Sequence, residues 1–178
     1  TISKLEQTKK EKFSSCLISG GCNFQGQLDS LGQKEKLQQL SSQFKLNFHT
    51  GLVNNKQEAQ AIAELADVVS FDFIADQETI KEVYGLDKLV TDYLASYQYL
   101  RDQVEVVPHI CIGLKGGQLA GEYKALEILS QLGVERLVFI VFIPTPGTAY
   151  ADRKPPAVEE VINLLCWARI KFPTVPLQ

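Results

Sequence analysis

The chain has 178 residues, 45% of them hydrophobic and 22% charged, which is enough to bury the core of one globular domain. A formal net charge of −3, with no lysine or arginine cluster, argues against nucleic acid or an acidic membrane surface as a partner. Cysteines at positions 16, 22, 111 and 166 match neither a disulfide framework nor a Cys-x-x-Cys zinc pattern, which favours a cytoplasmic location. The longest apolar run, residues 137–144, is too short to span a bilayer.

Hydrophobic periodicity predicts alternating strands and helices along the whole chain. After the polar end of a helix in residues 1–12, we expect strands at 13–19, 45–49, 67–72, 105–112 and 136–143. Helices are expected at residues 33–44, 56–66, 76–103 with a break at Gly85, 122–132 and 157–171. Because no linker or low-complexity stretch interrupts this pattern, residues 1–178 are predicted to form a single domain.

Strict alternation of continuous Val/Ile/Leu strands with helices predicts an α/β fold with a parallel sheet. Two architectures fit this pattern: an open doubly wound sheet, and a full or partial (β/α) barrel. In either architecture, ligands bind at the C-terminal ends of the strands. The loop after the first strand contains neither Gly-x-Gly-x-x-Gly nor a P-loop, which argues against a dinucleotide or nucleoside-triphosphate domain and favours the barrel.

Polar and glycine residues gather where the predicted strands end. The first strand runs into Ser19, Gly20 and Gly21, which form either a simple turn or a gap where a ligand approaches the backbone. The later strand ends contribute Asn47 and His49, Ser70 and Asp72, His109, Cys111 and Gly113, and Pro144, Thr145 and Gly147. Since parallel strands end at one edge of the sheet, we expect these residues to line one small-molecule site.

Asp72 has the clearest chemistry among these residues. A carboxylate at a strand end can accept two hydrogen bonds from a ribose diol, and it can equally cap a helix or pair with nearby backbone N–H groups. Cys111 lies in an apolar strand and is expected to be a buried small hydrophobe, and Cys166 beside Trp167 is expected to pack in the core. Periodicity alone leaves the reaction unspecified.

The segments at the strand ends resemble, in order and spacing, motifs of the radical SAM enzymes. Ser19-Gly20-Gly21 resembles the Gly-Gly-Glu motif, with Cys22 in place of the glutamate. Residues 69–72 and 82–87 resemble the ribose-binding strand end and the Phe-Tyr-Gly stretch of the biotin synthase branch. Residues 109–113, followed by Gly121-Glu122, resemble the Gly-x-Ile-x-Gly-x-x-Glu motif, and residues 143–148 resemble the loop after the sixth strand.

The likeness is nearest to biotin synthase-like proteins, a group that includes archaeal-type lipoyl synthases. It implies a partial (β/α)₆ barrel, of which this chain would contain strands two to six. It also implies a site for S-adenosylmethionine (SAM) in which Ser19, Gly20 and Gly21 hold the amine, Ser70 and Asp72 hold the ribose, and Ile112, Gly113, Pro144, Thr145 and Gly147 line the adenine. The substrate side would be formed by Asn47, His49 and His109.

The Cys-x-x-x-Cys-x-x-Cys motif, which carries the [4Fe–4S] cluster in this family, does not occur in the chain. Three thiolates must hold such a cluster before it can bind and reduce SAM. Because the chain also has no methionine, we expect it to be a piece truncated at both ends and inactive on its own. The intact enzyme would take electrons from an external donor and act on a small or carrier-bound substrate, with sulfur insertion as one option.

Two other readings of the sequence stay open. One is a non-catalytic or degenerate barrel that binds SAM or nothing. The other is a conventional (β/α) barrel lyase or isomerase that uses His49 or His109 as the acid or base. A rim without lysine and with few carboxylates weakens the second of these readings.

Overall fold

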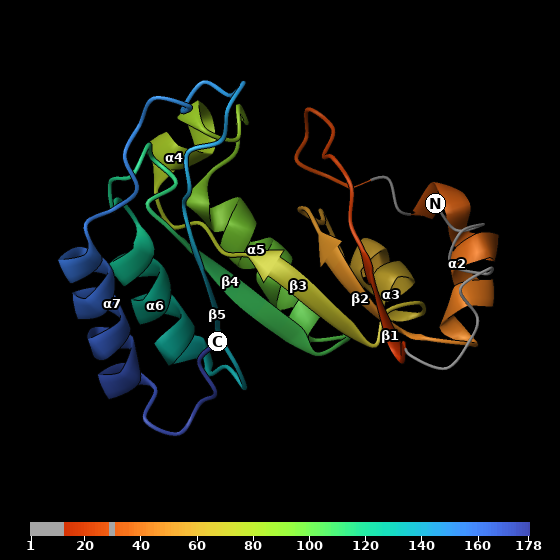
Figure 1. Ribbon diagram of the computed structural model, residues 1–178. Coiled ribbons are helices and arrows are strands. Elements are labelled where there is room, and N and C mark those ends of the chain that lie inside the picture. The colour runs from red at the N-terminus through yellow and green to blue at the C-terminus, as the bar shows by residue number, and fades with distance from the viewer. Residues whose placement is uncertain (1–12, 29–30) are drawn as a thin grey trace.

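A computed structural model describes residues 13–28 and 31–178, so the helix expected in residues 1–12 lies outside the described residues. Its parallel strands form a single sheet in which strands that follow one another in the chain lie side by side (Figure 1). The strands are β1 (Ser15–Ile18), β2 (Lys45–Thr50), β3 (Val68–Asp72), β4 (Val106–Ile112) and β5 (Val138–Val141). This sheet curls into a half-barrel, which confirms the partial barrel and excludes the reversing strand order of a doubly wound sheet.

Helices connect the strands as the periodicity predicted, with shorter bounds except for the helix at residues 122–132. They are α2 (Lys34–Ser41) after the 3₁₀ turn η1 (Leu31–Gln33), α3 (Lys56–Ala63), α4 (Gln77–Glu82), α5 (Val90–Arg101), α6 (Glu122–Leu132) and α7 (Val158–Lys171). The single helix expected over residues 76–103 is two helices, because Gly85 adopts φ 65° and ends the first of them. Asn55 and Asp76 begin α3 and α4 as side-chain caps, each accepting a hydrogen bond from a backbone N–H in the first turn.

Alternation along the strands separates two faces of the sheet. On the face covered by helices, Leu46 and Phe48 of β2 and Ile110 of β4 are at most 1% exposed. Burial of such side chains stabilises the fold by roughly 1.5–3 kcal/mol each. The residues between them point to the other, concave face, where His49 and His109 are only half-buried. The half-barrel therefore has one apolar face that forms the core and one polar face that is open to ligands.

One detail of the C-terminal part differs from expectation. Cys166 of α7 is exposed and not packed in the core, because Leu164 and Ala168 form the buried stripe and Cys166 lies about 200° around the helix from Leu164. The final residues run parallel to the start of β5, where Leu137 pairs with Leu177 and the N–H of Phe139 donates to the carbonyl of Gln178 at 2.7 Å. No helix in residues 13–28 and 31–178 is long and apolar enough to cross a membrane.

Candidate functional site

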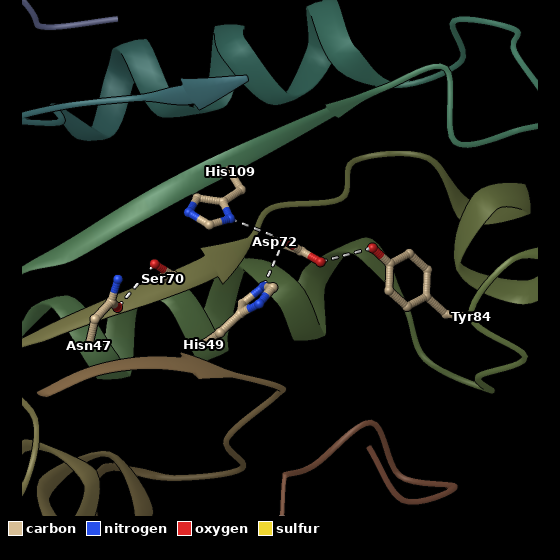
Figure 2. A network of polar contacts seen from close by, with 6 residues as sticks. All are labelled: Asn47, His49, Ser70, Asp72, Tyr84 and His109. Carbon is tan, nitrogen blue, oxygen red and sulfur yellow. Dashed lines mark hydrogen bonds and ion pairs between the residues drawn. The ribbon is translucent and has the colours of Figure 1, made fainter. Parts of the chain in front are cut away.

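Three side chains from neighbouring strands meet at the C-terminal edge of the concave face. In the parallel register Asp72 of β3 lies directly beside His109 of β4, and His49 of β2 lies beside Ser70, two residues before Asp72. Nε2 of His49 lies 3.1 Å from Oδ1 of Asp72, and Nδ1 of His109 lies 3.5 Å from the same oxygen (Figure 2). The sequence predicted all three residues at strand ends, and the structure brings them together. We call these three residues the His–Asp–His triad.

Tyr84 completes the surroundings of the Asp72 carboxylate. Its hydroxyl, which comes from the segment after α4, donates to Oδ2 of Asp72 at 3.3 Å (Figure 2). Burial, followed by the nearby charge of Asp72, raises the pKa of Tyr84, so that the phenol keeps its proton as a donor. Tyr84 lies in the stretch 82–87 that resembles a Phe-Tyr-Gly motif, and no role was predicted for it. Its position in an irregular segment beyond the strand gave no periodic signal for this contact.

The electrostatics of the triad favour an ionised carboxylate at neutral pH. Burial alone raises the pKa of Asp72, but the imidazoles of His109 and His49 outweigh that effect and hold the pKa well below its usual range. The hydrogen bond to Asp72 in turn raises the pKa of His49 above its ordinary value, against a smaller opposing effect of burial. Asp72 is therefore a negatively charged acceptor with an imidazole on either side.

A second polar pair lies next to the triad on the same face. The hydroxyl of Ser70 on β3 donates to Oδ1 of Asn47 on β2 at 3.1 Å (Figure 2). Ser70 is buried, while Asn47 is half-buried. Both predicted positions are thus close to the triad, and together they extend the row of hydrogen-bonding groups along the floor of the half-barrel.

The glycine turn after β1 is open to solvent. Ser19, Gly20 and Gly21 are exposed, and a Cβ added to Gly21 would meet no atom within 4 Å. The chain then folds back against the end of β2, where the carbonyl of Gly26 accepts the N–H of Leu52 at 2.7 Å. This packing brings the first two strand ends together and leaves the Gly20–Gly21 backbone accessible.

The loop between β4 and α6 is held by a buried carboxylate. Glu122, which is 8% exposed, accepts backbone N–H groups of Gly113 at 2.8 Å, Ala120 at 2.7 Å and Gly121 at 3.0 Å. The N–H of Gly113 is therefore already used within the protein. Ile112 is fully buried on the helix-covered face, so that only its backbone is available to a ligand.

The loop after β5 stands apart from the triad. Pro144, Thr145 and Gly147 are exposed, and the only side-chain hydrogen bond that Thr145 donates in the described chain goes to the carbonyl of Ile143. No hydrogen bond or ion pair among the described residues joins this loop to the triad. The predicted adenine-side residues of β4 and β5 thus lie on the rim, next to the triad in strand order but not in contact with it through polar groups.

The cysteines show no arrangement for an iron–sulfur cluster within the described residues. Cys22 and Cys166 are exposed, and Cys16 and Cys111 are half-buried on different strands. Cys111 follows His109 by two residues and faces the same side as Asp72, and burial followed by the charge of Asp72 raises its pKa. It is a neutral thiol at the edge of the site and not the core hydrophobe that its apolar strand predicted.

The architecture defines an α/β half-barrel with a polar concave face, and solved structures share it. The fold is similar to the crystal structure of methylornithine synthase (PylB), with a TM-score of 0.64 and 16% identity over 84% of this chain and 45% of that one. It is also similar to a domain of pyruvate-formate lyase-activating enzyme from Bacteroides vulgatus, with a TM-score of 0.59 and 10% identity over 93% of this chain and 98% of that one.

These similarities confirm the partial barrel fold that the motifs implied. The chain spans less than half the length of methylornithine synthase. It matches no protein-family model and no curated protein sequence. At these identities the similarity establishes the fold.

Proposed function

We propose that this chain is the SAM-binding core of a radical SAM enzyme. The observation that carries the proposal is the half-barrel shared with two radical SAM enzymes, with the resembling motifs at its strand ends. The intact protein would cleave SAM reductively in the cytoplasm with electrons from an external donor. Hydrogen abstraction from a small or carrier-bound substrate would follow, and the biotin synthase-like motifs favour sulfur insertion.

In this proposal the concave face receives the nucleoside. The exposed backbone at Gly21 is free to meet the amine and carboxylate of SAM, because a Cβ placed there would meet no atom within 4 Å, whereas the side chain of Leu28 borders Gly20. Asp72 keeps unused acceptor capacity, since a carboxylate offers about four lone-pair sites, and Ser70 lies beside it for the ribose hydroxyls. The rim residues Gly113 and Thr145 would border the adenine.

The chain's own residues do not fit a [4Fe–4S] cluster. Such a cluster needs three thiolates in close reach, and the cysteines here are separated on different elements. We therefore assign to this chain the binding and orientation of SAM and the exclusion of water around it. In this proposal the electron transfer to SAM would depend on a cluster that the cysteines of this chain do not hold.

The test uses the intact protein, reconstituted anaerobically with iron and sulfide. We expect cluster absorbance, and formation of 5′-deoxyadenosine and methionine from SAM after addition of dithionite. Asp72→Asn combined with Ser70→Ala should weaken SAM binding by at least about tenfold, as expected for lost hydrogen bonds to a polar ligand, and leave the cluster intact. The control Asp102→Asn changes an exposed carboxylate at the end of α5 and should alter neither.

Each opposite result has a clear meaning. Absence of both cluster absorbance and SAM consumption in the intact protein would refute the proposal. Tight SAM binding without cleavage would identify a degenerate binding protein. If SAM does not bind at all, the two remaining alternatives are a degenerate barrel without this ligand and a conventional lyase or isomerase that uses the imidazoles as acid and base.

A further inference from the structure

We propose that the His–Asp–His triad binds one divalent first-row transition-metal ion. His49 offers Nε2, His109 offers Nδ1 and Asp72 offers Oδ1, and these three atoms lie within 4.8 Å of one another. The inference goes beyond the proposed function, because it concerns a mononuclear site built from residues of this chain. It stands whether or not the intact protein cleaves SAM.

The distances between the three atoms are close to those that a single ion requires. Metal–nitrogen bonds of about 2.0–2.1 Å place two ligand atoms of a tetrahedral ion about 3.4 Å apart. Two of the three separations are 3.1 Å, from Asp72 to His49, and 3.5 Å, from Asp72 to His109. The two imidazole rings lie with their centroids 5.2 Å apart and their planes tilted by 50° (Figure 2). Small rotations of these rings bring both nitrogens to one ion.

Hydrogen bonding within the protein leaves one of the three atoms without a partner. His49 is hydrogen-bonded to Asp72, whereas Nδ1 of His109, although 3.5 Å from Oδ1 of Asp72, is buried and makes no hydrogen bond of good geometry in the described part of the chain. A buried polar atom without a partner destabilises the metal-free protein, because it has lost its hydrogen bonds to water. A metal ion removes that destabilisation and satisfies the two nitrogens and the oxygen together.

The surroundings of the triad also suit a metal ion. The hydroxyl of Tyr84 holds Oδ2 of Asp72 and so directs Oδ1 toward the two imidazoles, as outer-shell donors do in metal sites (Figure 2). All three ligands come from adjacent strands of one sheet, which fixes their spacing more rigidly than loops would. With one carboxylate and two neutral imidazoles, the site would carry a net charge of +1 once occupied.

The donor set selects the class of metal. Two imidazoles and one carboxylate suit Zn²⁺ or Fe²⁺, whereas Mg²⁺ and Ca²⁺ prefer oxygen ligands alone. Three protein ligands leave at least one coordination position open, and the concave face is where that position would be exposed to a substrate. Since Oδ2 of Asp72 remains free of the metal, it can still accept a ribose hydroxyl, and the metal and SAM need not exclude each other.

Zn²⁺ titrated by calorimetry into the chelator-treated 178-residue chain, without SAM or cluster, tests the proposal. We expect one Zn²⁺ per chain. Loss of an outer-shell partner weakens metal binding by roughly 10–100-fold, and we expect an effect in this range for Tyr84→Phe. We expect Zn²⁺ binding to weaken by more than this in each ligand variant: His49→Ala, His109→Ala and Asp72→Asn. The control Asp67→Asn, at the other end of β3 and hydrogen-bonded to the backbone of Leu46, should bind as the parent chain does.

Co²⁺ substitution identifies the ligands independently. Nitrogen and oxygen ligation should give visible d–d bands without the near-ultraviolet charge-transfer band of a cobalt–thiolate bond. Circular dichroism must show that each variant is folded, and His49→Gln and His109→Gln replace any alanine variant that is not. The proposal is overturned if Zn²⁺ does not bind, if the triad variants bind it undiminished, or if the thiolate band appears.

Discussion

Replacing Glu122 with glutamine removes part of the acceptor capacity that holds the loop between β4 and α6. One carboxylate oxygen accepts a hydrogen bond from the N–H of Gly113, and the other accepts hydrogen bonds from the N–H groups of Ala120 and Gly121. A glutamine side chain has one oxygen and one NH₂ group, so that one end of it must turn a donor toward a backbone donor. The change keeps the size of the side chain and isolates the hydrogen bonding.

The expected loss of stability follows from that count. If the amide oxygen stays with Ala120 and Gly121, the buried N–H of Gly113 loses its partner, which costs roughly 1–3 kcal/mol. The two remaining bonds also weaken, because they no longer involve a charged acceptor. We expect Glu122→Gln to lower the free energy of unfolding by about 2–3 kcal/mol and the melting temperature by about 5–10 °C for a domain of this size.

Urea denaturation measures the loss of stability, and amide hydrogen exchange measures the opening of the loop at the N–H of Gly113. The matched control is Glu127→Gln on the same helix, whose carboxylate makes an exposed ion pair with Lys171 at 2.8 Å. Such pairs contribute about 0.2–1 kcal/mol. If Glu122→Gln destabilises no more than Glu127→Gln, and exchange at Gly113 is not faster, the carboxylate does not hold the loop as the structure indicates.

Three further predictions concern the site. Gly51→Ala should destabilise the protein by about 1–3 kcal/mol in urea unfolding, because the new Cβ would lie 2.1 Å from the backbone oxygen of Gly26. Gly21→Ala, where a Cβ has open space, is the control, and equal losses of stability in the two variants would contradict the close packing of Gly51 against Gly26. In metal-free protein, NMR titration should give His49 a pKa above its ordinary value. The stabilisation by its Asp72 pair should be complete below the unfolded pKa and lost as pH rises through the folded one, and Asp72→Asn should abolish both effects. Cys111 should react with iodoacetamide more slowly than the exposed cysteine of α7, since its pKa is raised, and equal rates in the folded state would contradict this.

Most of the fold was predictable because its signals are local. Continuous Val/Ile/Leu runs located the strands, and α6 (Glu122–Leu132) has the predicted bounds because Gly133, at φ 75°, ends it. Prediction was poorer where tertiary packing determines the length of a strand or the exposure of a side chain. The sheet edge shortens β5 to Val138–Val141, and the packing direction of α7 leaves Cys166 exposed.

The candidate site was predictable as a set of positions but not as a geometry. Strand ends located Asp72, His49 and His109, because all C-terminal ends of parallel strands share one edge. The register that puts His109 directly beside Asp72 depends on loop lengths and crossovers, which carry no periodic signal. The contact of Tyr84 depends on an irregular segment after α4, and the role of Glu122 depends on a loop that closes over its side chain.

The agreement of strand order with chain order has a consequence for how the protein is made. As the ribosome releases each strand after β1, the preceding strand with which it pairs is already present, so the sheet can grow by addition of one strand at a time to the same edge. The triad cannot form in that way until late, because Asp72 receives His49 from an earlier strand and His109 from a later one. During synthesis the contact between His49 and Asp72 can form once β3 has been released. The triad is complete only when β4 pairs with β3 and adds His109.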